Sequence, residues 1–133
     1  MPQKELGLAV IGSGRIGSLR AILSSGHPAV KYLGVSDINI ENAKKLAAKS
    51  SAQKFTDDNH ELISDPNVNV VIVSTSEHEH FDSVMHALEL GKPVLVEKPI
   101  ALSVDEADKM IKKSEETGTL FRVGYAQRFK RRY

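Results

Sequence analysis

The sequence predicts an α/β fold, a doubly wound parallel sheet of about six strands with flanking helices. Short apolar runs of strand type alternate along the chain with segments whose apolar residues recur at helical spacing. The run VNVVIVST (68–75) is apolar on both faces, which is typical of a central strand in a parallel sheet. Because strands that alternate with helices join through right-handed crossovers, these observations favour one parallel sheet with helices on both faces.

Each predicted strand is a short apolar run bounded by turn residues. The first run leads directly into a glycine-rich turn, and the run KFT is the shortest of the series. In chain order the predicted strands are 5–11, 31–36, 54–56, 68–75, 93–97 and 120–125.

The predicted helices lie between these strands. The second and third cover 40–49 and 57–64, and Asp65-Pro66 stops the third. The first helix ends at Gly26 and Pro28, and its apolar residues recur at helical spacing: Ile16, Leu19, Ile22 and Leu23.

Two capping boxes predict where the last two helices begin. Ser76 with Glu79 opens one helix, and Ser103 with Glu106 opens the other, since each pair has the spacing of a reciprocal cap. Gly91 and Gly118 end these helices.

Composition bounds the class of protein. The chain has 133 residues, which is one domain by size, and 41% of them are hydrophobic. A net charge of +1 favours neither nucleic acid nor a membrane surface as a partner, although basic residues gather near the end (Arg128, Lys130, Arg131 and Arg132). The absence of cysteine fits a reducing compartment, and the start lacks a secretory apolar segment. We therefore expect a cytoplasmic protein.

The first strand-to-helix turn carries the strongest motif. Gly12, Gly14 and Gly17 form G-x-G-x-x-G directly after a strand and at the opening of a helix, and Asp37 ends the second strand 20 residues beyond Gly17. Gly12 permits the turn, Gly14 lets the backbone approach a pyrophosphate, and Gly17 allows close helix–strand packing. A glycine turn with an unrelated acid is the alternative, but the context favours the Rossmann dinucleotide-binding fold.

The same turn predicts how the phosphates are bound. The amides around Arg15 and Ile16 lie at the positive end of the first helix, where anions bind, and Ser13 of the same turn is also expected to bind the cofactor. Asp37 can accept hydrogen bonds from a ribose 2′-hydroxyl but repels a 2′-phosphate, and the adjacent Ile38 carries no cation to offset that repulsion. NAD is therefore favoured over NADP, unless Arg15 or a lysine from 44–49 reaches the phosphate.

Ligands of such sheets bind at the carboxyl ends of the strands. Ser74 and Thr75 follow the fourth predicted strand, and Glu97 and Lys98 follow the fifth. We therefore expect these four residues to lie along the same crevice as the glycine turn.

With these motifs, the sequence resembles the N-terminal domain of the Gfo/Idh/MocA oxidoreductase family, which includes glucose–fructose oxidoreductase and inositol dehydrogenase. The matching segments occur in family order over essentially the whole chain. They are AVIGSGRIGS, the strand-end SD, VNVVIVST, ALELGKPVLVEKPIALS and VGYAQRF. The E-K-P element is the most specific of them.

The resemblance implies hydride transfer between a nicotinamide cofactor and a hydroxyl of a sugar, inositol or similar polyol. It places Lys98 beside the nicotinamide as the catalytic residue that helps to move the proton, and Glu97 in the lining of the cofactor pocket. It also implies a cis bond between Lys98 and Pro99. The family pattern T-P-N-x-x-H survives here only as Thr75 and His80, and His80 is expected to reach the cofactor.

Family members continue into a second α/β domain that forms the substrate pocket. The resemblance therefore implies a cofactor domain at 1–124 and, at 125–133, the start of a connection to that second domain. It further implies a homo-oligomeric full-length enzyme, and a 133-residue chain that binds cofactor without oxidising a polyol. The alternative is a stand-alone, non-catalytic module that binds a dinucleotide for regulation.

Other candidate residues favour simpler interpretations. His78 and His80 form H-x-H, but residues two apart on a helix point away from each other and no third ligand is evident, so no metal site is predicted. His60 and His86 are interpreted as surface or packing residues. The terminal basic cluster has no nucleic-acid-binding motif behind it.

The role of Lys98 depends on its neighbour. A free lysine titrates near 10.4, about three units too high for an effective base at neutral pH. A carboxylate beside the ammonium group favours its charged form, whereas desolvation disfavours it. Lys98 can therefore act as a base only if desolvation and the positive charge of the nicotinamide ring prevail, or if Glu97 points away. Otherwise the two residues are simply charges at a strand end.

Overall fold

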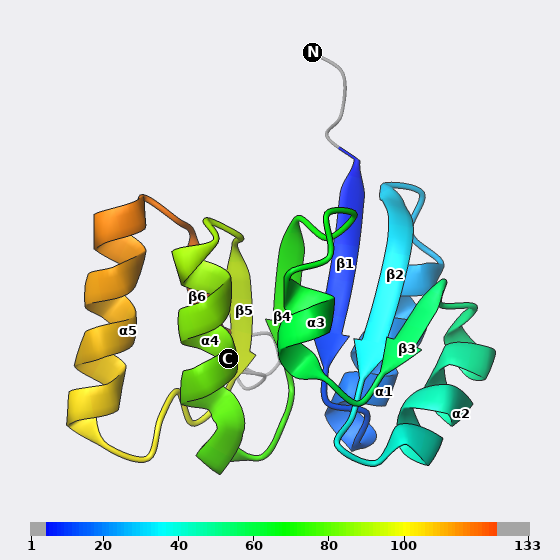
Figure 1. The fold of residues 1–133 in the computed structure, drawn as a ribbon, viewed down its shortest axis with the longest axis horizontal. Coiled ribbons are helices and arrows are strands. Elements are labelled where there is room, and N and C mark those ends of the chain that lie inside the picture. Colours follow the sequence, from blue (N-terminus) through cyan, green and yellow to red (C-terminus); the bar gives the residue numbers. More distant parts are fainter. Residues whose placement is uncertain (1–4, 125–133) are drawn as a thin grey trace, which may run out of the picture.

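The computed structural model describes residues 5–124, which form one six-stranded sheet (Figure 1). Every strand pair is parallel, and the strand order is β3-β2-β1-β4-β5-β6. This arrangement confirms the predicted doubly wound α/β fold. The chain builds outward from β1 to β3, then returns to the centre at β4 and builds outward on the other side.

The strands begin and end close to the predicted positions. The strand expected at 68–75 is shorter at both ends. Before the strand, the Asn69 side chain accepts a hydrogen bond from the Gly7 amide. After the strand, Ser74 and Thr75 lie against the glycine turn. The last predicted strand residue, Tyr125, lies outside the described residues. The strands are β1 (Leu6–Ile11), β2 (Val30–Ser36), β3 (Lys54–Thr56), β4 (Val70–Val73), β5 (Val94–Glu97) and β6 (Phe121–Gly124).

The helices also follow the predicted order, with one addition. A short 3-10 helix, η1 (Glu77–Glu79), precedes the fourth α-helix. The α-helices are α1 (Arg15–Ser25), α2 (Ile40–Ser50), α3 (Asn59–Ile63), α4 (His80–Glu89) and α5 (Val104–Thr117).

One predicted cap forms and the other does not. Ser103 Oγ accepts a hydrogen bond of 3.2 Å from the Glu106 amide at the start of α5. The box predicted at Ser76 and Glu79 is wrong, because the Glu79 amide donates instead to the Ser76 backbone carbonyl at 2.9 Å and closes η1. The 3-10 turn satisfies that amide without a side chain, and α4 begins only at His80.

The apolar residues predicted for α1 do not face the core. Ile16, Leu19, Ile22 and Leu23 are 42–67% exposed, whereas Gly17 and Ala21 are the buried residues of this helix. The helix lies so close to β1 that a Cβ at Gly17 would be 1.9 Å from the Gly12 carbonyl oxygen. Only very small residues fit at that contact, so helical spacing of large side chains did not identify the packed face.

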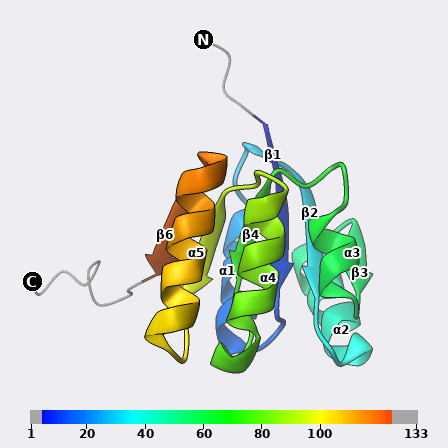
Figure 2. The ribbon, with the colours of Figure 1, turned by 60° about the vertical axis from the view of Figure 1, so that its left-hand side comes forward.

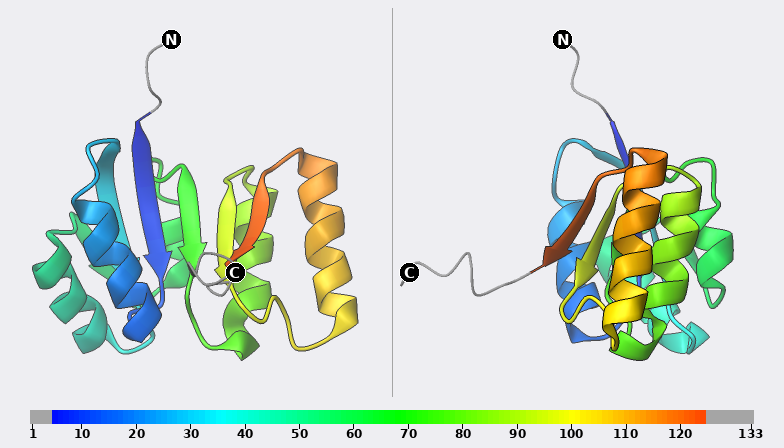
Figure 3. Two further views of the ribbon diagram at one scale, coloured as in Figure 1. Left: turned by 180° about the vertical axis from the view of Figure 1, so that it is seen from behind. Right: turned by 90° about the vertical axis from the view of Figure 1, so that its left-hand side faces the viewer.

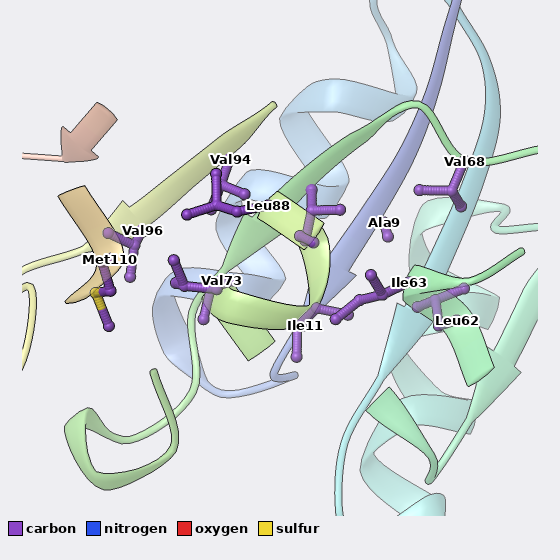
Figure 4. Packing of buried hydrophobic residues seen from close by; sticks show 13 residues of the cluster. Ala9, Ile11, Leu62, Ile63, Val68, Val73, Leu88, Val94, Val96 and Met110 are labelled. Carbon is purple, nitrogen blue, oxygen red and sulfur yellow. The ribbon is translucent and has the colours of Figure 1, made fainter. Parts of the chain in front are cut away.

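The two faces of the sheet are covered by different helices (Figures 1 and 3). Helices α1 and α2 lie on one face, and α3, α4 and α5 lie on the other, where α4 and α5 run side by side (Figure 2). Figure 4 shows the larger apolar cluster, which fills the space under α3, α4 and α5 with residues such as Ile11, Val73, Leu88 and Met110. A second cluster around Val10, Val35 and Leu46 lies under α1 and α2.

A buried polar contact ties β2 to the loop before β4. Tyr32 Oη donates a hydrogen bond of 2.6 Å to the Asp65 carboxylate, which is only 9% exposed. Burial, this hydrogen bond and the charge of Asp65 raise the pKa of Tyr32 to about 12. The folded chain therefore favours the protonated phenol well above the pH at which a free tyrosine ionises.

This contact makes stability fall in alkaline solution. Because the folded pKa of Tyr32 lies above its unfolded value near 10, the contribution is complete below pH 10 and is lost as pH rises toward 12. Tyr32→Phe should lower the free energy of unfolding at pH 8 by about 1 kcal/mol, the usual net value of a hydrogen bond. Urea unfolding at pH 8, 10 and 11 checks this: the difference between parent and variant should shrink with pH, and a constant difference contradicts the role of the phenol.

Candidate functional site

A hollow at the carboxyl edge of the sheet gathers part of the predicted site. It lies where the chain order reverses between β1 and β4, the position at which sheets of this kind bind their ligands. Six of the predicted cofactor residues line it, from the β1–α1 turn, the end of β2 and the end of β4. The lining residues are Gly12, Gly14, Asp37, Ile38, Asn59, Ser74, Thr75, Ser76 and Glu79.

The glycine turn is fixed by backbone contacts to the neighbouring strands. Gly12 has φ of +99°, a conformation that side chains other than glycine rarely adopt, and a Cβ there would lie 2.7 Å from the Ser74 carbonyl oxygen. Its amide donates to the Ser36 carbonyl at 2.9 Å, so the turn is joined to β2 as well as to β4. The turn is therefore pre-formed between three strands.

Asp37 is oriented by two backbone amides. One carboxylate oxygen accepts from the Ser13 amide at 3.0 Å, and the other accepts from the Asn39 amide at 2.8 Å. Each carboxylate oxygen has a further lone pair that can accept from a ligand hydroxyl. The predicted ribose acid thus stands beside the predicted phosphate turn, and Ser13 couples the two.

Gly14 differs from the other two glycines of the motif. A Cβ at Gly14 would meet no atom within 4 Å, and its φ of −76° is open to any residue. Neither the turn nor the packing of the chain explains a glycine there. A ligand lying close against the backbone at Gly14 does explain it, as a bound pyrophosphate requires.

Two hydroxyl groups beside the hollow have no hydrogen-bond partner. Across residues 5–124, Ser74 Oγ and Thr75 Oγ1 are the buried side-chain polar atoms left unpaired. An unsatisfied buried hydroxyl costs about 1–3 kcal/mol, so buried hydroxyls normally have partners. A polar ligand in the hollow would satisfy them, and the residues present therefore fit a bound dinucleotide.

Glu97 lies close to α1 and is engaged there. Its carboxylate forms an ion pair with Arg20 of α1, and its side chain is 15% exposed. Gly124, the register partner of Glu97 on β6, leaves room for the pair, since a Cβ there would lie 3.2 Å from Arg20 Nη2. Lys98 is exposed, and among the described residues Arg20, not Lys98, is the ion-pair partner of Glu97.

His80 is buried and does not line the hollow. It is 1% exposed, with Nδ1 at 2.9 Å from the Pro99 carbonyl oxygen and Nε2 at 3.1 Å from the Thr75 carbonyl oxygen. This histidine lies between the loop after β4 and the loop after β5, next to Thr75 and the E-K-P element. The Lys98–Pro99 peptide bond is cis, as the resemblance implied.

The remaining predicted residues flank the hollow. Arg15 and Ile16 are exposed at the start of α1, and Gly17 is buried beneath them against Gly12. The hydroxyl of Ser13 donates to the Ser36 carbonyl at 3.0 Å, which holds the turn against β2.

Sequence reasoning missed four residues. Asn59, Ser76 and Glu79 line the hollow, and Arg20 pairs with Glu97. Asn59 could have been found, because it begins the helix after β3 and so lies at the carboxyl edge of the sheet. Arg20 had no such signal, since its partner is 77 positions away in the chain.

Two histidines outside the hollow, His60 and His86, join α3 and α4. The rings of His60 and His86 stack with centroids 4.2 Å apart, and His60 Nε2 lies 2.6 Å from an Asp82 carboxylate oxygen. Burial and the charge of His60 lower the pKa of His86. Neither ring lines the hollow, and residues 5–124 contain no group of three or more His, Cys, Asp or Glu residues placed to hold a metal ion.

Comparison with known proteins gives the family. The Gfo/Idh/MocA model, described as an oxidoreductase family with an NAD-binding Rossmann fold, matches residues 6–125. The chain belongs to this family. The predicted family is thereby confirmed, and the matched family domain is the NAD-binding one.

The chain covers only part of each relative with which it was compared. The scyllo-inositol 2-dehydrogenase (NAD(+)) of Bacillus subtilis is 34% identical over 96% of this chain and 37% of that enzyme. The myo-inositol 2-dehydrogenase of Thermotoga maritima is 33% identical over 95% and 38%. The crystal structure of GenD2 from gentamicin A biosynthesis, in complex with NAD, has a TM-score of 0.85 and 29% identity over 93% and 37%. The chain therefore spans little more than a third of these relatives.

Within this family domain, Gly14 and Gly17 should respond differently to an added methyl group. Gly14→Ala should keep stability within about 1 kcal/mol, the small cost of alanine at a helix cap, yet weaken NAD binding by about tenfold because the methyl obstructs the ligand. Gly17→Ala should cost about 3 kcal/mol of stability, because its Cβ collides with the Gly12 carbonyl oxygen.

Thermal unfolding and calorimetric titration with NAD check both variants. Wild-type affinity in Gly14→Ala would contradict the role of this backbone in binding, whatever its stability. Unchanged stability in Gly17→Ala would contradict the tight packing of α1 on β1.

Proposed function

We propose that this chain is the cofactor-binding part of an NAD-dependent oxidoreductase that moves hydride between NAD and a hydroxyl of inositol, a sugar or a similar polyol. The observation that carries this proposal is the hollow itself. A pre-formed glycine turn, an oriented strand-end carboxylate and two unpaired hydroxyls converge there, at the switch point of the sheet. The names of the inositol dehydrogenases among the relatives support the substrate class.

We assign the binding roles by position around the hollow. The amides of Arg15 and Ile16 at the start of α1 hold the pyrophosphate, since the Gly12 and Ser13 amides already donate to Ser36 and Asp37. Asp37 accepts hydrogen bonds from the ribose hydroxyls. Ser74 and Thr75 contact the ligand through the hydroxyls that lack partners in the chain. His80 packs between the loops of Thr75 and Pro99, with one ring nitrogen close to each carbonyl oxygen.

Lys98 is the proposed acceptor of the substrate's hydroxyl proton. When bound, NAD supplies the hydride acceptor, and the alcohol must then lose a proton to a nearby base. The pairing of Glu97 with Arg20 supports this role, because it turns the neighbouring carboxylate away from the ammonium group. The exposure of Lys98 at the carboxyl edge also leaves its side chain accessible to a substrate.

The whole enzyme is proposed to contain a second domain. In this proposal residues 1–124 form the cofactor domain, residues 125–133 begin the connection, and the second domain completes the substrate pocket. The exposed apolar strip on α1 (Ile16, Leu19, Ile22 and Leu23) supports a further contact surface, because isolated soluble domains rarely expose such a strip. We also propose a homo-oligomer and a cytoplasmic location, the latter from the cysteine-free composition. No helix in the described part of the chain is long and apolar enough to cross a membrane.

Cofactor preference tests the binding half of the proposal. The chain should bind NAD more tightly than NADP, because the Asp37 carboxylate repels a 2′-phosphate, and Asp37→Ala should narrow the gap. Calorimetric titration of the parent and the variant with both cofactors measures this. Equal or stronger binding of NADP by the parent would contradict the predicted preference for NAD. If the parent binds neither cofactor, the proposed function is wrong.

Turnover tests the catalytic half. In the full-length enzyme, Lys98→Ala should keep the Kd for NAD within a few fold but lower kcat by roughly 10²–10⁴, the usual range for general acid–base catalysis. Lys112→Ala, which removes an exposed lysine of α5, is the matched control. A near-normal kcat for Lys98→Ala would show that Lys98 is only a charge at the end of a strand.

A further inference from the structure

Asn59 stands at the end of the hollow where the base of a dinucleotide would lie. The glycine turn follows β1, Asp37 ends β2, and Asn59 follows β3, and these three strands are adjacent in the order β3-β2-β1. If the turn holds phosphate and Asp37 holds ribose, the base lies farther toward β3. Asn59 and Ile38 line the hollow on that side.

The Asn59 carboxamide is anchored by a buried serine. Ser36 Oγ donates a hydrogen bond of 2.7 Å to Asn59 Oδ1, and Ser36 is fully buried. With Oδ1 at the serine hydroxyl, the Nδ2 group keeps two donors, and neither bonds to another part of the described chain. The Oδ1 atom keeps a second lone pair.

A carboxamide held in this way matches one edge of adenine. Adenine presents a ring nitrogen acceptor next to its N6 amino donor, and an asparagine side chain offers the complementary pair, an N–H donor and a carbonyl acceptor. Ile38 adds apolar surface for the face of a base, since it is 73% exposed beside the hollow. Contacts to the phosphates and the ribose alone do not distinguish one base from another.

We propose that Asn59 recognises the adenine base of the cofactor by a paired hydrogen bond, so that the site discriminates adenine from other purines. This inference rests on the proposed function, because it requires that the hollow binds the dinucleotide. It adds a specificity-determining residue that the glycine motif and the strand-end acid do not supply. The buried Ser36 hydroxyl acts as the positioning group behind it.

The test compares NAD with nicotinamide hypoxanthine dinucleotide, in which a carbonyl replaces the 6-amino group. The parent chain should bind NAD about tenfold more tightly, within the range of one good bidentate contact between asparagine and adenine. Asn59→Ala should lose about tenfold in NAD affinity while its affinity for the analogue changes little, so that the two Kd values converge. Asn67→Ala, an exposed site in the loop before β4 at the opposite edge of the sheet, should keep the preference.

A second variant, Asn59→Asp, separates the loss of the hydrogen-bond donor from the loss of the fold. It keeps the size of the side chain and an oxygen for Ser36, but replaces the donor by an acceptor, so NAD binding should weaken while thermal stability is kept. Equal binding of both dinucleotides by the parent overturns the inference, as does a preference that survives in Asn59→Ala. If the parent binds neither dinucleotide, the proposed function has failed instead.

Discussion

The close approach of α1 to β1 is the constraint on which the rest of the site depends. A Cβ at Gly17 would lie 1.9 Å from the Gly12 carbonyl oxygen, so the helix begins almost in contact with the strand it follows. That approach sets the turn between β2 and β4, where Gly12 bonds to Ser36 and packs on Ser74. The Ser13 amide is then in place to orient Asp37. The contacts that pack α1 against β1 therefore also shape the binding surface.

Features that depend on local patterns were predictable from the sequence. Alternating strands and helices gave the parallel sheet, because connection rules leave few other topologies. The glycine spacing and Asp37 predicted one end of the hollow, since both are local features placed at strand ends. The three-residue strand β3 has the bounds that were predicted for it.

Features that depend on packing or distant contacts were not predictable. The large apolar residues of α1 had helical spacing, but the tight approach at Gly17 buries small residues instead. Ser76 and Glu79 had the spacing of a cap, yet a 3-10 turn satisfied the same amide through the backbone. His80 matched the expected position of a ligand-binding residue but lies buried, with both ring nitrogens facing carbonyl oxygens of two loops.

Glu97, the acid of the E-K-P element, points away from the cluster that buries Val96, because neighbours on a strand point to opposite faces of the sheet. Val94 and Val96 of β5 are buried in the cluster under α3, α4 and α5, so Glu97 points to the other face, where α1 lies. Arg20 neutralises the carboxylate there, and the absence of a side chain at Gly124 leaves room for the pair. Alternation alone could have shown that Glu97 points away from the face of Val96. Only the folded chain could supply Arg20, the cation that makes a partly buried carboxylate tolerable at that position.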